Sequence, residues 1–187
     1  MSDANMYERL AALFSYPAGG YRLQADDCLG AMGSEPGEAA AAFREFHVGI
    51  EGLGTEELQE LFTRTFDLNP MCTLEIGWQL YGEDYHRGEF LVRMREQLRE
   101  YDVPESGELP DHLSHALLLL GKLEAEEAAE FASRYVLPAL DKMRAAWKEN
   151  RNAFAPLLEA AFAFLKNRYP YDPALTPKRV PELHVLQ

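Results

Sequence analysis

The sequence predicts an all-α protein, a single-domain helical bundle of about eight or nine helices. Three observations support this fold class. Apolar residues recur at helical spacing along most of the chain, and strand-like alternation does not occur. Glycine and proline divide the periodic segments at short intervals, as expected for helices joined by short loops. With 187 residues, the chain is long enough to bury one substantial core.

Five helices are expected in the amino-terminal half. Asn5 and Glu8 resemble a capping box, Gly33 follows a short second helix, and Thr55 is a good N-cap for the fourth. The fifth segment is short and almost entirely apolar, so we expect a buried helix in which Gly77 allows a close neighbour, although periodicity alone does not exclude a strand. The expected ranges are residues 5–14, 23–32, 38–50, 55–67 and 73–81.

Four more helices are expected in the carboxyl-terminal half. The clearest covers residues 87–103, and the next begins at about Pro110 and runs to residue 123. A long helix over residues 125–149 should kink at Pro138, and the last begins at Asn152. From Tyr169 onward the chain is rich in proline and without periodicity. The expected organisation is therefore one domain over residues 1–168 and a tail over residues 169–187.

The charge of the chain bears on its partners. The formal net charge of −13 argues against binding to nucleic acid, because a protein that neutralises phosphates needs the opposite sign. An acidic surface instead attracts a basic partner segment. Two cysteines outside any C-x-x-C pattern favour a reducing compartment, and neither a secretory signal nor a long apolar run is present. We therefore expect a cytoplasmic protein without stable membrane insertion.

The stretch "GELPDHLSH" from Gly107 to His115 has two interpretations. Asp111, His112 and His115, together with the acids near Glu83, are residue types that bind metals, and a helical-bundle metal-dependent enzyme is the alternative function. However, bundle metal sites repeat an acid-x-x-His motif on separate helices, and this stretch offers one irregular copy. The preferred interpretation makes Pro110 the first helical residue, with Asp111 in the first turn. We predict no catalytic residue, no metal site and no cofactor.

The middle of the chain is unusual in its sequence of elements. Between Leu58 and Leu120, a short apolar helix, a Gly-Trp pair, an arginine-rich helix and "ELPDH" follow closely on one another. A groove between helices with acidic edges would fit the mode in which a helical peptide lays its apolar face into a protein.

Three segments of this region, "ELFTRTFDLNP", "LYGEDYHRGEFLVRM" and "ELPDHL", resemble the cytoplasmic chaperones of molybdenum oxidoreductases. The nearest branch is the nitrate reductase delta-subunit (NarJ-like) type within the TorD/DmsD superfamily. The resemblance implies an all-α, TorD-like protein that is not an enzyme. It also implies a partner, the apo catalytic (alpha) subunit of a molybdenum oxidoreductase. Such chaperones bind this subunit through its basic amino-terminal leader until the molybdopterin guanine dinucleotide cofactor is inserted.

The resemblance also assigns residues. Two sets match the family's motifs and are expected to form the peptide groove and its support: Glu108, Leu109, Pro110, Asp111 and His112 in the hinge and helix-start signature, and Tyr81, Gly82, Glu83, Arg87 and Gly88 in the preceding segment. The role of His115, the molybdoenzyme served, and the choice between a monomer and a domain-exchanged dimer stay open. A permanent structural subunit of a redox complex is a further alternative.

Overall fold

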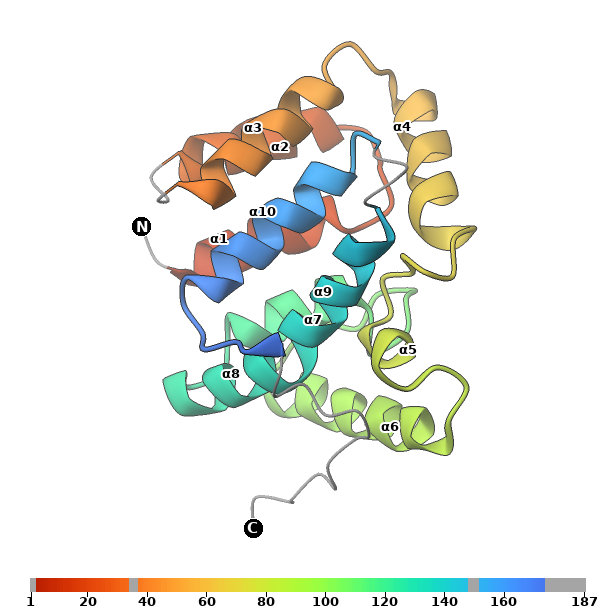
Figure 1. Ribbon diagram of the computed structural model, residues 1–187, viewed down its shortest axis with the longest axis vertical. Helices are drawn as coiled ribbons and strands as arrows, with labels where there is room; N and C mark the ends of the chain where they lie inside the picture. The colour runs from red at the N-terminus through yellow and green to blue at the C-terminus, as the bar shows by residue number, and fades with distance from the viewer. Residues whose placement is uncertain (1–2, 34–36, 148–151, 174–187) are drawn as a thin grey trace.

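The computed structural model describes residues 3–33, 37–147 and 152–173, and these residues form the all-α bundle that the sequence predicts (Figure 1). They make nine continuous helices, because two π-helical turns join their neighbouring α-helices without a break. The elements in chain order are α1 (Asp3–Leu13), α2 (Tyr21–Met32), α3 (Glu38–Gly49), α4 (Thr55–Phe62), η1 (Thr63–Asp67), α5 (Ile76–Tyr81), α6 (Tyr85–Glu100), α7 (Leu113–Leu120), α8 (Ala125–Phe131), η2 (Ala132–Val136), α9 (Leu137–Ala146) and α10 (Ala155–Lys166).

One half of the molecule has a dry aromatic core. Figure 1 shows α10 beside α3, and its main contacts are with α3 and α9. Ten of the twelve residues of α10 are buried, as expected for a helix that is apolar on all sides. Phe154, just before α10, is fully buried and packs against four aromatic rings at centroid distances of 5.4–6.4 Å: Tyr21, Phe46, Phe62 and Phe66.

Several helix starts differ from the prediction. The first helix begins at Asp3, so Asn5 lies inside it, and α2, α6 and α10 begin at Tyr21, Tyr85 and Ala155.

The fourth and fifth helices also differ. The fourth helix begins with Thr55 as its first residue, and Gly54 is the N-cap. The Glu57 carboxylate accepts a hydrogen bond from the Gly54 N–H at 2.8 Å, so the first turn is capped from within the helix. The helix predicted over residues 73–81 begins at Ile76, because residues 74–76 pair with another segment, as described below.

The predicted kink at Pro138 takes the form of a π-helical turn. Pro138 lies at the start of α9, and η2 occupies the five residues immediately before Leu137. Proline lacks an N–H and crowds the preceding turn, so a wider turn here accommodates the break in the α-helical hydrogen-bond ladder. The continuous helix from α8 to α9 thereby changes its pitch beside α5 and α7.

The first part of the predicted tail packs on the bundle. The Tyr169 hydroxyl lies 2.5 Å from that of Tyr7, and the Tyr171 hydroxyl donates to Asp141 at 3.0 Å. Ser133 donates to the Pro170 carbonyl at 2.6 Å. Residues 174–187 of this tail lie outside the described residues. Across the part of the chain that the structure describes, each helix is too short or too polar to cross a bilayer.

Candidate functional site

The helix that carries "PDHLSH" begins later than predicted. We expected Pro110 to start it and Asp111 to lie in its first turn, but α7 begins at Leu113 with His112 as N-cap. The reason is an extended pairing between residues 111–113 and 74–76. Ile76 N–H donates to the Asp111 carbonyl at 2.9 Å, and Leu113 N–H donates to the Leu74 carbonyl at 2.8 Å. The short bridge fixes the start of α7 against the start of α5.

Asp111 is fully buried and caps α5 instead of its own helix. Its Oδ2 accepts a hydrogen bond from the Gly77 N–H, in the first turn of α5, at 3.1 Å. A Cβ atom at Gly77 would lie 2.5 Å from this oxygen and 2.9 Å from the Phe90 ring. Glycine is therefore required for the close approach, and the expectation that Gly77 admits a neighbour is confirmed.

The charge of Asp111 is only partly compensated. Arg87 Nε lies 3.7 Å from Asp111 Oδ2, and both Arg87 Nε and Asp111 Oδ1 are buried without a hydrogen-bond partner. Burial raises the pKa of Asp111 to about 6, Arg87 opposes the shift, and Glu75 adds to it. The Arg87 guanidinium lies 5.3 Å from the centre of the Trp78 ring. The ion pair between Arg87 and Asp111 thus connects α6 with the segment before α7, next to α5.

His112 acts as the N-cap of α7. Its Nδ1 accepts from the Ser114 N–H at 3.3 Å and lies 2.7 Å from the Ser114 hydroxyl. Burial, together with the nearby His115, lowers the pKa of His112 to about 4. The cap therefore holds a neutral imidazole at neutral pH.

His115, which the sequence left without a role, holds the loop before α7. Its Nε2 accepts from the Ser106 N–H at 3.0 Å, and its Nδ1 lies 2.9 Å from the Leu109 carbonyl. A neutral ring with the proton on Nδ1 satisfies both contacts. Both nitrogens of this buried ring are therefore used to fix the loop over residues 104–110.

These hydrogen bonds leave few side-chain atoms of Asp111, His112 and His115 available to bind a metal. Within the described ranges, no group of three or more histidine, cysteine, aspartate or glutamate side chains has a geometry that could hold an ion. Asp111, His112 and His115 each form one of the structural contacts above. The arrangement is that of a rigid junction, and the metal-enzyme alternative has no assembled centre among these residues.

The predicted site residues divide into exposed and buried ones. Glu108, Leu109, Glu83 and Gly88 are exposed, while Tyr81, Gly82 and Arg87 are half-buried. Pro110, Asp111 and His112 are buried and are therefore not accessible at the surface.

The sequence analysis did not bring together a further group of residues around α5, which we call the α5 surface. It is defined by Asp67, Leu68, Met71, Glu75, Trp78 and Glu108. Leu68 is 73 % exposed and Met71 is 65 % exposed, so two large apolar side chains of this loop face solvent. Trp78 Nε1 donates to the Pro70 carbonyl at 3.1 Å, which holds the loop after η1 against α5. Gln79 Nε2 donates to the carbonyls of Met71 and Thr73 on the same loop, at 3.3 and 3.0 Å.

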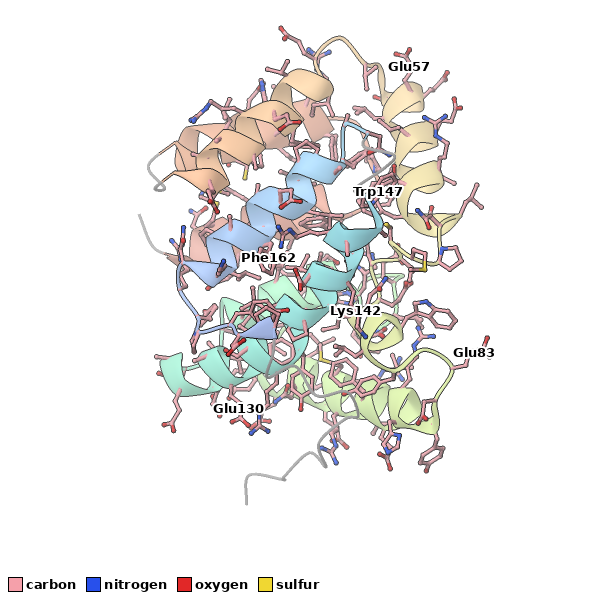
Figure 2. All side chains as sticks on the ribbon, in the orientation of Figure 1. Glu57, Glu83, Glu130, Lys142, Trp147 and Phe162 are labelled. Atoms are coloured by element: carbon pink, nitrogen blue, oxygen red, sulfur yellow. The ribbon has the colours of Figure 1, made fainter. Side chains whose placement is uncertain are left out.

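The Glu75 carboxylate is affected by two other acids of this surface. Burial raises the pKa of Glu75, Arg87 lowers it, and Glu108 and Asp67 raise it further. Burial also raises the pKa of Asp67. The nearby cations Arg87 and Lys142 are already engaged, because Lys142 Nζ donates to the Gln79 carbonyl at 2.6 Å (Figure 2 labels Lys142). The α5 surface therefore combines exposed apolar side chains with negative charge that a further cation would relieve.

The signal for this surface was present but ambiguous. The segment over residues 73–81 was expected to be a buried helix, which placed Trp78 in no particular environment. Exposure of an apolar residue next to a turn depends on which neighbours cover it, and that is a tertiary property.

Comparison with known proteins adds family information to this geometry. A family model described as "Nitrate reductase delta subunit" matches residues 31–160, a stretch that includes α5, α6, α7 and both sides of the junction. A comparison with curated proteins gives no match.

Proposed function

This chain belongs to the nitrate reductase delta-subunit family, a family of molybdoenzyme assembly chaperones, and on that premise we propose how it recognises its client. The client is the apo catalytic subunit of a nitrate reductase-like molybdoenzyme. The chaperone binds the basic amino-terminal leader of this subunit on the α5 surface and keeps the subunit competent, in the cytoplasm, until its cofactor is inserted.

The observation that carries this proposal is the occurrence of exposed apolar side chains and several carboxylates together on the α5 surface. Leu68 and Met71 offer apolar contacts, and the charges of Glu108 and Asp67 raise the pKa of Glu75. A segment that carries basic and apolar residues together satisfies both features, whereas an anionic or wholly apolar partner satisfies one at most.

The predicted site residues contribute in different ways. Glu108 and Leu109 are exposed and available to the leader, while Asp111 and His112 fix the backbone that presents them. Tyr81, Gly82 and Gly88 belong to the turn between α5 and α6 and its flanks, and support the edge of the same surface.

A chaperone of this kind acts by mass action. An apo subunit that lacks its cofactor exposes apolar surface and is prone to aggregate, and binding to a partner lowers the population of the exposed state. The excess negative charge of the chain, −13 overall, speeds the approach of a basic leader and makes binding sensitive to salt.

Calorimetric titration tests the proposal. The titrant is a synthetic peptide of the first 30 or so residues of the nitrate reductase catalytic subunit encoded in the same genome. We expect a dissociation constant well below 1 mM, and about tenfold weaker binding for Glu75→Gln with Glu108→Gln, since two charge contacts are removed. The matched control is Glu124→Gln with Glu126→Gln at the exposed start of α8.

Two results would contradict the proposal. Binding weaker than about 1 mM, roughly −4 kcal/mol, would remove leader recognition. Equal weakening by the control pair would show that net charge and not the α5 surface is responsible. Co-purification of the chain with the mature, active enzyme would instead identify a permanent structural subunit.

A further inference from the structure

The helix that leads into the α5 surface ends in a π-helical turn. This turn, η1, directly continues α4, and the Leu68 N–H closes it by donating to the Thr63 carbonyl, five residues earlier, at 2.9 Å. A π-helical turn holds one residue more than an α-helical turn, and such turns occur frequently at functional sites. The extra residue moves each residue after it by about 100° around the helix axis and about 1.5 Å along it, compared with an uninterrupted α-helix.

Two residues of the α5 surface lie at the end of this turn. Asp67 is the last residue of η1, and Leu68 is its C-cap. The charge of Asp67 contributes to the raised pKa of Glu75, and the Leu68 side chain is exposed. The positions of Asp67 and Leu68 on the surface therefore depend on the extra residue of the turn.

A buried hydroxyl group lies inside the turn. The Thr65 side chain is fully buried, and its hydroxyl donates to the Leu61 carbonyl at 2.5 Å. In an uninterrupted α-helix this carbonyl accepts from the N–H of Thr65 itself. Bonds from a hydroxyl to the carbonyl four residues earlier weaken the α-helical hydrogen-bond ladder locally. The Thr65 hydroxyl therefore favours the change from the α-helix to the wider turn at this point.

Asn152 holds the Thr65 hydroxyl in place. Its Nδ2 donates to Thr65 Oγ1 at 2.7 Å, and its Oδ1 accepts from the Phe154 N–H at 2.8 Å. Phe66, the next residue of the turn, packs on the Phe154 ring at a centroid distance of 5.4 Å. The segment before α10 therefore holds η1 by a ring contact and by one directional hydrogen bond.

From these contacts we propose that Thr65 and Asn152 are positioning residues for client recognition. Their hydrogen bond keeps η1 π-helical and so holds Asp67 and Leu68 on the α5 surface. Thr65 is buried, so it acts on a client only through these two neighbours. This inference rests on the proposed function for what the surface binds, but the control of the surface by Thr65 does not depend on it.

The direct test compares nuclear magnetic resonance spectra of full-length variants without a client. Thr65→Val keeps the branched shape of the side chain and removes the hydroxyl, so it should shift the Leu68 amide resonance. It should also shift the Trp78 indole resonance, because Trp78 Nε1 donates to the Pro70 carbonyl in the loop after η1. Thr65→Ser keeps the hydroxyl and should bring both resonances back. The control, Ser15→Ala, removes a bond of the same kind at the end of α1 and should leave both in place.

A second variant tests the same hydrogen bond from its other partner. Asn152→Asp keeps an acceptor for the Phe154 N–H and lacks the donor to Thr65, so it should shift the same two resonances. Resonances that stay in place in both Thr65→Val and Asn152→Asp, or that move equally in Ser15→Ala, would overturn the positioning role.

The second measurement is a double-mutant cycle in titrations with the leader peptide. Asp67→Asn should weaken leader binding about threefold in the natural chain and in Ser15→Ala, because it removes one exposed charge contact. In Thr65→Val, where Asp67 has left its place on the surface, the same substitution should change the affinity by less than about 1.5-fold. An equal loss in the Thr65→Val and Ser15→Ala chains would also overturn the positioning role. Failure of the leader to bind any chain, the natural one included, would overturn the proposed function alone, since the resonance shifts do not involve the leader.

Discussion

The aromatic core around Phe154 and the junction between α5 and α7 are both buried, but they are held by different interactions. Phe154 contacts four rings, and such apolar contacts depend on volume more than on direction. At the junction, Asp111, His112 and His115 each meet a defined donor or acceptor at 2.9–3.3 Å. The first region supplies stability that several residues share, and the second fixes one geometry that few other residues could supply.

The largest expected effect is in the aromatic core. Phe154→Ala removes a fully buried ring and should lower the free energy of unfolding by about 4 kcal/mol, measured by urea denaturation. Tyr85→Ala, at a ring that is 80 % exposed, should change it by less than about 0.5 kcal/mol. If the remaining folded Phe154→Ala protein bound the leader peptide much more weakly, the two regions would not be as independent as their contacts indicate.

The next effect separates the junction from ordinary packing. Gly77→Ala places a methyl group against Asp111 Oδ2 and the Phe90 ring, and should destabilise the fold by about 3 kcal/mol although it adds only one carbon atom. Gly88→Ala on α6 meets nothing within 4 Å and should stabilise the helix by up to about 1 kcal/mol. Equal unfolding free energies for the two variants would show that the contact between α5 and Asp111 is loose.

Neighbouring residues of the junction should give opposite pH dependences. Asp111 has a pKa raised from 3.8 to about 6, so the folded state binds its proton more tightly and stability from this group falls as pH rises from about 4 to 6. His112 has a pKa lowered from 6.5 to about 4, so the unfolded state binds its proton more tightly and stability rises from about pH 4 to 6.5. The two contributions partly cancel in the natural chain.

Single substitutions should reveal each slope. Urea unfolding of Asp111→Asn should gain stability with rising pH more steeply than the natural chain, and His112→Asn, which keeps a capping side chain, less steeply. Between about pH 4 and 6.5, we expect the change in the free energy of unfolding of each variant to differ from that of the natural chain by about 2 kcal/mol. Asp102→Asn, at the exposed turn after α6, should keep the natural profile. Parallel profiles for all three variants would mean that neither shifted pKa is real.

The smallest effect concerns the loop before α7. His115→Leu removes the acceptor of Ser106 N–H and the donor to the Leu109 carbonyl, but water can reach the exposed loop, so the loss should be about 1 kcal/mol. Amide hydrogen exchange should increase over residues 104–110 and stay unchanged in α10. Faster amide hydrogen exchange in α10 as well would show that the junction and the aromatic core are coupled.

The fold was predictable to the extent that it depends on periodicity. The all-α class and the buried faces of the long helices follow from apolar spacing, as Phe90, Met94 and Leu98 on α6 illustrate. The predicted start of α7 was wrong, because Pro110 and Asp111 are good residues for a first turn and nothing in the local sequence reveals the pairing with residues 74–76. A contact between segments 34 residues apart along the chain overrides the local preference.

The sequence pointed to the residues of the junction but not to which of them are buried. Motif matching pointed to Asp111 and His112, and both lie at the junction, but whether a polar side chain faces solvent or the interior depends on the neighbouring helices. Glu75 and Met71 could not be assigned from the sequence, since the charge cluster and the exposed apolar pair arise only when the loop after η1 folds against α5.

The shortness of α5 has a consequence for the order in which this protein becomes active. Six residues do not hold a helix by themselves in water, so α5 depends on Asp111, Lys142 and the pairing with residues 111–113. These partners come from later parts of the chain. A nascent or damaged chain that lacks these partners therefore does not form α5 or the surface around it.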